Sequence, residues 1–272
     1  WLNPRLFKLN PDRSLKKVAG VPPDYFSATG QLWGNPVYRW HNHKKNNYEW
    51  WTERFRQEFE LYDVVRVDHF RGFESYYEID AGEQTAVRGA WKPGPKKELF
   101  EAVEKKLGKL NLIAEDLGAL NRGVYRLMAE TGYPGMKVLQ FAFDGERRNP
   151  HLPEYTTENS VCYTGTHDND TLYGFIKGLQ GDKLRIFEES LNRVLKANCE
   201  VPAKGTAHMA DAIIRLAMKS RARIAVVPVQ DLLKLDSFAR MNVPSKRDGN
   251  WRFRLKRPVS DKALSVLRRI TQ

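Results

Sequence analysis

The chain has 272 residues, of which 41% are hydrophobic, so it can bury a sizeable core in one large domain or two small ones. Its two cysteines exclude a disulfide framework and indicate a reducing compartment, which predicts a cytoplasmic protein. The net charge is +12, and no apolar run approaches the ~20 residues that span a bilayer, so we expect no membrane contact.

The first distinctive segment, residues 18–38, predicts an aromatic loop. Its prolines and glycines argue against a helix or a regular strand. The segment also holds Tyr25, Phe26 and Trp33, which make it too apolar for an idle linker. Large rings on an ordered loop indicate a lid over a binding site. The alternative is a loop that packs over the edge of the core.

The run Val64–Val67 predicts a strand of a parallel sheet, buried on both faces. Arg66 and Asp68 are two residues apart, so in a strand they point to the same side. A guanidinium group beside a carboxylate keeps it ionised and aimed, which suits a nucleophile or a charge stabiliser. The alternative is a structural ion pair at the end of a strand.

Helices and strands alternate along the rest of the chain. A core-facing helix, with Tyr48, Trp51, Phe55 and Phe59 on one face, precedes the first strand. Residues 81–95 are expected to be irregular. Further helices are predicted around residues 99–107, 124–128, 184–194, 209–217 and 264–270, with Gly108 ending the first of these. Further strands are predicted at residues 112–114, 136–143, 161–164 and 224–229.

This alternation is typical of an α/β fold with a parallel sheet and helical crossovers. Acidic clusters at three strand ends favour a (β/α)8 TIM barrel. Only five strands are predicted, and the chain begins at Trp1 without Met, so we expect a barrel that is incomplete at its N-terminus. No repeat or linker divides the sequence, which predicts one domain over residues 1–272 with no internal boundary.

The C-terminal segment from Ser245 to Gln272 is basic, with nine Lys and Arg residues against two Asp residues. A basic tail contacts nucleic acid in some proteins. Since no RNA- or DNA-binding motif accompanies it, we interpret it as a solvated surface and expect no nucleic-acid partner.

Three acids, Asp68, Glu115 and Asp168, lie at the ends of predicted strands. Paired carboxylates around one bond are typical of glycosidic transfer, in which one carboxylate attacks the anomeric carbon and the other protonates the departing oxygen. Asp68 suits the attacking role. Burial and the like charge of Asp116 would raise the pKa of Glu115 for the acid role. The alternative for acids at strand ends is a metal site.

Eight stretches match those of a known family in order from Val18 to Trp251: VAGVPPDYFSATGQLWGNPVYRW, VVRVDHFRGFESYYEI, LIAEDLG, PGMKVLQFAF, VCYTGTHDNDT, VPVQDLL, ARMNVP and GNW. On these stretches the chain closely resembles 4-α-glucanotransferases of the amylomaltase type, glycoside hydrolase family 77. Two short loops, after Trp91 and after Gly118, depart from the family pattern. The resemblance implies a TIM barrel of the α-amylase superfamily type. It also implies an N-terminal portion with the first barrel strands, which we expect this chain to lack.

The resemblance implies a role for each candidate site residue. Asp68 is expected to be the nucleophile, Glu115 the general acid/base and Asp168 the stabiliser of the transition state. The expected substrate contacts are Arg66, His167, Asp24, Tyr25, Phe26, Trp33, Asp116 and Asn242, of which the residues between Asp24 and Trp33 cover the acceptor side.

The implied reaction moves an α-1,4-glucan segment to the 4-hydroxyl of glucose or another glucan, with retention through a covalent glycosyl-enzyme. Its partners are maltooligosaccharides and other α-1,4-glucans, and no cofactor or metal is expected. A plant source would place the protein in the plastid. The alternatives are an α-1,4-glucan hydrolase and a non-catalytic glucan-binding fragment.

Overall fold

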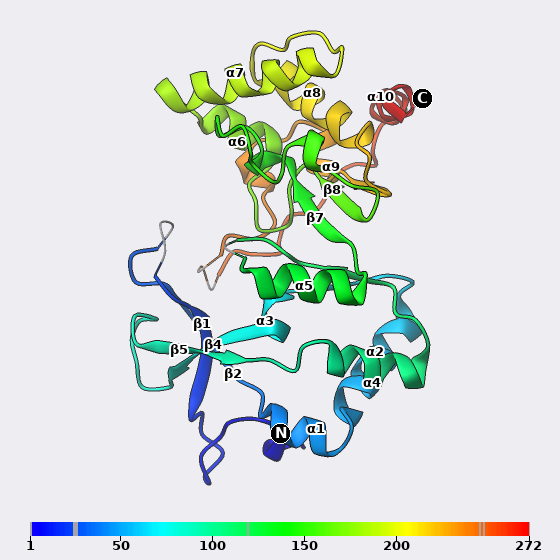
Figure 1. Cartoon of the computed structure of the whole chain (residues 1–272). Coiled ribbons are helices and arrows are strands. Elements are labelled where there is room, and N and C mark those ends of the chain that lie inside the picture. Colours follow the sequence, from blue (N-terminus) through cyan, green and yellow to red (C-terminus); the bar gives the residue numbers. More distant parts are fainter. Residues whose placement is uncertain (1, 24–26, 119, 245, 247, 272) are drawn as a thin grey trace. The chain divides into compact units, whose positions relative to one another are not determined.

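The computed structural model describes residues 2–23, 27–118, 120–244, 246 and 248–271. The chain forms two compact units, Trp1–Gly135 and Met136–Gln272, named here the N-terminal and C-terminal units (Figure 1). Each unit is described by itself. Asp24, Tyr25 and Phe26, which the sequence predicts as substrate contacts, lie outside the described residues.

A four-stranded antiparallel sheet is the largest sheet of the N-terminal unit (Figure 1). Its strand order is β2-β1-β4-β5. The strands are β1 (Lys17–Val21), β2 (Gln31–Pro36), β4 (Ser75–Asp80) and β5 (Gly89–Pro93). The prediction of no regular strand within residues 18–38 is therefore wrong, as is the prediction of an irregular segment over residues 81–95.

Glycine and proline are tolerated in this sheet because of where they stand. A Cβ at Gly20 would lie 2.3 Å from the carbonyl oxygen of Gln31, so only glycine lets β1 and β2 approach so closely. Gly30, with φ 67°, stands immediately before β2. The strand β2 lies at the edge of the sheet, where Pro36 removes no hydrogen bond from a central strand.

A second, two-stranded sheet pairs β3 (Val65–Val67) with β6 (Leu112–Ala114) in parallel. This confirms the parallel pairing that the sequence predicts. The strand β6 is buried along its whole length, but β3 is only half-buried and the preceding Val64 is 45% exposed. The prediction that Val64–Val67 is buried on both faces is therefore wrong, because β6 is the only strand paired with β3 among the described residues.

The helices of the N-terminal unit pack around an aromatic core. They are η1 (Pro4–Leu6), α1 (Trp40–Lys45), α2 (Glu49–Leu61), α3 (Arg71–Glu74), α4 (Lys97–Leu107) and α5 (Arg122–Thr131). Figure 1 shows α2 and α4 side by side. The predicted stripe is confirmed, since Tyr48, Trp51 and Phe55 are buried in the core together with Phe100. Gly108 ends α4 with φ 79°, as predicted.

The C-terminal unit has a three-stranded sheet of order β7-β8-β9, and β8 and β9 run parallel. The strands are β7 (Gly135–Val138), β8 (Ser160–Tyr163) and β9 (Ile224–Val226). Two of them are shorter than predicted. The 3-10 helix Leu139–Phe141 follows β7 directly, and Pro228 caps a helix shortly after β9.

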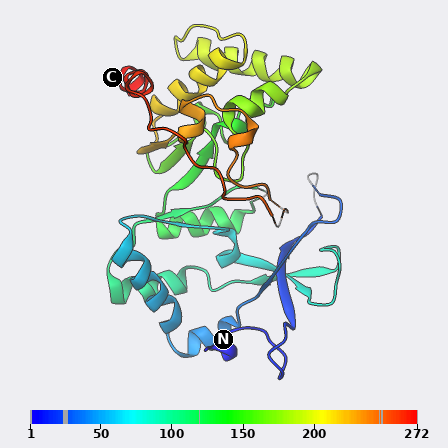
Figure 2. The same cartoon turned by 180° about the vertical axis from the view of Figure 1, so that it is seen from behind.

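The helices of this unit carry a second core. They are η2 (Leu139–Phe141), η3 (Pro153–Tyr155), α6 (Leu172–Gly178), α7 (Gly181–Ala197), α8 (Thr206–Met218), α9 (Val229–Leu232), η4 (Ser237–Ala239) and α10 (Asp261–Thr271). Buried residues of α7 and α8, among them Leu191 and Ile213, belong to one hydrophobic cluster. Figure 2 shows this unit from behind.

The described strands thus fall into three separate sheets and do not close a barrel. Within the described part of the chain, no helix is both long enough and apolar enough to cross a membrane.

Candidate functional site

The ends of β3 and β6 bring two of the predicted acids next to each other in the N-terminal unit. Val67 and Ala114 are register partners, so Asp68 and Glu115 each follow the last paired residue of adjacent parallel strands. The backbone continues this pairing. The Glu115 N–H donates to the Val67 carbonyl at 3.0 Å, and the Phe70 N–H donates to the Glu115 carbonyl at 3.1 Å.

Asp68 carries an open carboxylate held by its neighbour. Arg66 Nη1 donates to Asp68 Oδ1 at 2.8 Å, as the two-residue spacing predicts. The Asp68 side chain is 79% exposed. An ion pair this exposed contributes little to folding stability. What the pair does provide is a carboxylate of fixed direction that remains open to a ligand.

Glu115 is held at both oxygens by backbone donors. The His69 N–H donates to Oε2 at 2.7 Å, and the Leu117 N–H donates to Oε1 at 2.8 Å. Burial raises the pKa of Glu115, and the charge of Asp68 adds to this, while Arg66 and the two N–H groups oppose it. The raised pKa agrees with the sequence argument, but the like charge comes from Asp68 and not from Asp116.

His69 follows Asp68 in the sequence and contacts Glu115, although the sequence does not predict it as a site residue. Its backbone is left-handed, with φ 50°, and its N–H is one of the two donors to Glu115. Its ring meets the ring of Trp33 edge-on at 4.8 Å between centroids. Burial and then the charge of Arg71 lower the pKa of His69 to about 4, so the ring is neutral at pH 7. No spacing rule in the sequence indicates such a conformation.

Asp116 and Trp33 are the other described candidates of the N-terminal unit. Asp116 is half-buried beside Gly135, where an added Cβ would come within 2.5 Å of its Oδ2. Trp33 lies on β2, is 43% exposed, and donates its indole N–H to Gln31 Oε1 at 3.1 Å. An exposed ring on an edge strand is available for stacking.

In the C-terminal unit, Asn242 contacts the adjacent residues His167 and Asp168, although it is far from both in the sequence. Asn242 Nδ2 donates to Asp168 Oδ1 at 2.5 Å, and the Asn242 N–H donates to the His167 carbonyl at 3.1 Å. His167 Nε2 lies 3.3 Å from Asp168 Oδ2. These contacts join three residues that the sequence predicts separately as site residues.

Two further residues of this cluster were not predicted. Arg240 Nη2 donates to the Asp168 carbonyl at 2.6 Å, so it fixes the main chain of that residue. Trp251 lies with its ring 5.2 Å from the His167 ring and is half exposed. Its N–H donates to the Met241 carbonyl at 2.7 Å. The motifs ARMNVP and GNW contain both residues, but only the folded loop shows that they lie beside His167 and Asp168.

The loop that carries Asp168 is fixed by a buried carboxylate. Asp231 accepts from Thr164 Oγ1 at 2.6 Å and from the Leu172 N–H at 2.7 Å. Burial raises the pKa of Asp231. Asp231 therefore ties the residue after β8 to the start of α6, and the loop with Asp168 lies between these two points.

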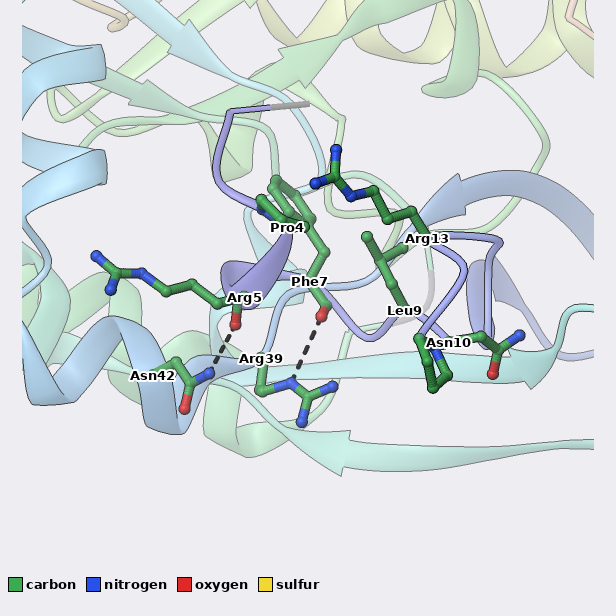
Figure 3. Close-up of a pocket in the computed structure, with 9 residues that line it drawn as sticks. Pro4, Arg5, Phe7, Leu9, Asn10, Arg13, Arg39 and Asn42 are labelled. Carbon is green, nitrogen blue, oxygen red and sulfur yellow. Dashed lines mark hydrogen bonds between the residues drawn. The ribbon is translucent and has the colours of Figure 1, made fainter.

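The described residues hold no group of three or more His, Cys, Asp or Glu side chains placed to bind a metal ion. A pocket of about 390 Å³ lies near η1 on the N-terminal unit (Figure 3). Its lining is Pro4, Arg5, Phe7, Leu9, Asn10, Pro11, Arg13, Arg39 and Asn42. None of the predicted site residues lines it.

Comparison with known proteins gives concordant matches. The model of the family Glyco_hydro_77, described as 4-alpha-glucanotransferase, matches residues 1–260. The 4-alpha-glucanotransferase of Streptococcus pneumoniae strain TIGR4 is 47% identical over 255 residues, which are 94% of this chain and 49% of that protein. A chloroplastic/amyloplastic 4-alpha-glucanotransferase of Solanum tuberosum is 43% identical over 255 residues, 94% of this chain and 42% of that protein.

Among solved structures, an amylomaltase from Streptococcus agalactiae in complex with acarbose matches with a TM-score of 0.91 at 36% identity. The match covers 100% of this chain and 53% of that one, so the mixed α/β fold is that of half an amylomaltase. The chain likewise spans about half the length of the curated relatives it matches. By the extent of these matches, the chain belongs to the 4-alpha-glucanotransferase family Glyco_hydro_77.

Proposed function

We propose that this chain contributes the reacting carboxylates of a 4-α-glucanotransferase. The reaction moves an α-1,4-glucan segment to the 4-hydroxyl of glucose or another glucan and retains the anomeric configuration. The observation that carries this proposal is the placement of Asp68 and Glu115 at the ends of β3 and β6, with Arg66 on one acid and two N–H donors on the other. Family membership supports the same reaction.

In this proposal Asp68 attacks the anomeric carbon and forms the glycosyl-enzyme. Its exposed carboxylate, aimed by Arg66 at 2.8 Å, suits a nucleophile. Glu115 gives its proton to the departing glucan oxygen and later takes one from the acceptor hydroxyl. The raised pKa of Glu115 supports the acid role, because a larger fraction of the carboxyl group is protonated near neutral pH.

Asp168 is proposed to stabilise the positive charge that develops on the sugar ring. Asn242 and His167, which contact its two oxygens, are proposed to hold sugar hydroxyls with it. The other proposed substrate contacts are Arg66, Asp116, Trp33 and the loop residues Asp24, Tyr25 and Phe26. The ligands are maltooligosaccharides and other α-1,4-glucans, and the S. agalactiae amylomaltase bound to acarbose supports a ligand of that kind.

We further propose that both units belong to one (β/α)8 barrel without a domain boundary, completed by strands outside residues 1–272. Apolar side chains near two strands support this. Leu61 and Val64, just before β3, are exposed, as are Ile224 and Val226 of β9. Unpaired strand edges with apolar neighbours are typical of surfaces that other strands cover. We place the protein in the cytoplasm, or in the plastid if its source is a plant, as the name of the S. tuberosum relative indicates for that protein.

The products formed from maltotriose test the reaction. The protein is residues 1–272 supplied with the half of the S. pneumoniae relative that this chain does not cover. Glucose together with maltodextrins longer than maltotriose is the result expected for transfer. Maltose and glucose alone would assign a hydrolase instead, and binding of maltotriose without turnover would assign a glucan-binding fragment.

A further inference from the structure

His69 has a backbone conformation that is uncommon for a residue with a side chain. Its φ of 50° lies in the left-handed region, which glycine and asparagine adopt more readily. In this conformation its N–H donates to Glu115 Oε2 at 2.7 Å. Strained backbone of this kind persists only where the surrounding structure holds it.

Two neighbours hold the His69 ring. The ring of Trp33, on β2, contacts it edge-on with an interplanar angle of 87°. On another side stands Gly72, where an added Cβ would come within 3.1 Å of His69 Cδ2, so glycine leaves the room that the ring occupies. The imidazole is neutral at pH 7, since burial and the charge of Arg71 lower the pKa of His69 to about 4. The ring therefore acts by packing and not as a cation.

We propose that His69 is a positioning residue for Glu115, and that Trp33 keeps His69 in the conformation that directs its N–H to the carboxylate. The inference rests on the proposed function, because it takes Glu115 to be the general acid/base. It gives Trp33 a second role besides substrate contact. The contacts Trp33–His69–Glu115 then connect the β1–β2 hairpin to the proton donor.

The His69 N–H is one of a small set of groups that set the orientation and charge of Glu115. The others are the Leu117 N–H, Arg66, which favours the ionised form, and Asp68, which disfavours it. Without the His69 N–H the carboxyl group is held at one oxygen only and its ionised form loses a donor. Its pKa then rises further, and a fraction of its orientations no longer faces the departing oxygen.

Residue 69 allows a matched pair of variants. His69→Val disfavours the left-handed conformation, whereas His69→Asn tolerates it and removes only the ring. Arg13→Val is the control, because Arg13 has a φ of 67° and its N–H donates to the Asn10 carbonyl, away from the acids. Trp33→Ala removes the ring that packs on His69.

Turnover is measured with maltotriose and with α-maltosyl fluoride, whose leaving group needs no protonation. The protein is residues 1–272 supplied with the remaining half of the S. pneumoniae relative. His69→Val is expected to lower kcat on maltotriose about tenfold at nearly unchanged KM, the order supported by one hydrogen bond to a charged group. Fluoride release in the first turnover should change little, because only the second step with this donor, in which Glu115 takes the proton of the acceptor hydroxyl, depends on Glu115. His69→Asn should show a smaller loss of the same kind, and Arg13→Val none. Trp33→Ala also removes a proposed substrate contact, so it can raise KM as well, but its loss of kcat should be larger on maltotriose than in the first release of fluoride.

Equal losses on both donors, or the same loss for His69→Val and His69→Asn, would overturn the proposal. If His69→Val does not fold, His69→Asn and Trp33→Ala carry the test. A wild-type protein inactive on both donors would refute the proposed function. In that case an NMR titration of ¹³C-labelled glutamate in the chain itself still decides on His69. The pKa of Glu115 must rise in His69→Val and not in Arg13→Val, and an unchanged value overturns the proposal.

Discussion

Asn242 donates its side-chain amide to Asp168, 74 residues earlier in the chain, at 2.5 Å. The same residue donates its backbone N–H to the His167 carbonyl, so one asparagine holds both residues of the motif. The contact connects the ARMNVP and THDND motifs, which the sequence presents as unrelated stretches. It gives Asp168 a fixed direction within the C-terminal unit.

Asn242→Ala is expected to lower kcat/KM for maltotriose by about 10- to 100-fold, the range for one hydrogen bond to a charged group. Asn250→Ala is the matched control. Asn250 pairs with both backbone groups of Val243 in the same loop but does not contact Asp168. A smaller loss in Asn250→Ala than in Asn242→Ala supports the assignment. Unchanged kcat/KM in Asn242→Ala would remove Asn242 from the site.

The variants Asp68→Asn and Glu115→Gln are expected to lose activity at different chemical steps. Asp68→Asn should abolish the glycosyl-enzyme, because a neutral amide is a poor nucleophile. Glu115→Gln should slow transfer from oligosaccharides far more than transfer from a donor with an acidic leaving group, which needs little protonation. Rapid-quench mass spectrometry of the protein detects the intermediate. Equal losses on both donors in Glu115→Gln would exclude Glu115 from the acid role.

The sequence predicts that Tyr25 and Phe26 belong to a lid over the acceptor side. Rings stacked on acceptor glucose units would keep water from the intermediate. Replacing either ring by Ala should therefore raise the ratio of hydrolysis to transfer, measured as glucose release against maltodextrin lengthening. An unchanged ratio would favour the alternative, in which this segment only packs over the edge of the core.

Asp231 makes stability depend on pH. Its pKa is raised by burial, so the folded state binds a proton more readily than the unfolded state does. Its contribution to the free energy of unfolding is thus largest at acidic pH. It decreases as pH rises from the ordinary Asp value through the raised one. Urea unfolding measured across this range should show the decrease.

An amide at position 231 keeps both contacts, because its oxygen can accept from the Leu172 N–H and its NH₂ can donate to Thr164 Oγ1. Asp231→Asn is therefore expected to remove the contribution of Asp231 to this pH dependence at little cost. Asp231→Ala leaves both partners unpaired and should cost about 1–3 kcal/mol. The assignment is contradicted if the Asn variant loses as much as the Ala variant.

The parts of the fold that the sequence predicts well are those with a local signal. The helix α4 has an apolar stripe and ends at Gly108, and β6 is a short apolar run followed directly by Glu115. The antiparallel sheet was missed because its determinants are not local. Gly20 in β1 reads as a strand breaker, yet it is required by the approach of Gln31 from the neighbouring strand.

The same distinction between local and distant determinants applies to the candidate site. The pairing of Asp68 with Arg66 follows from a spacing of two residues, and the contact is present. The conformation of His69 and the contact of Asn242 with Asp168 depend on segments distant in sequence. The identity of a residue as His or Asn does not predict its φ value or its hydrogen-bond partner. Only the folded chain shows the conformation of His69 and the contact of Asn242.

We propose as the central claim that Asp68 of this chain is the nucleophile of a glucan transfer reaction, and that strands outside residues 1–272 complete the barrel. The direct measurement is disproportionation of maltotriose by residues 1–272, alone and with the remaining half of the S. pneumoniae relative, in the wild-type and Asp68→Asn forms. We predict little turnover alone, lengthened maltodextrins when both parts are present, and none with Asp68→Asn. Turnover that persists unchanged in Asp68→Asn would contradict the account.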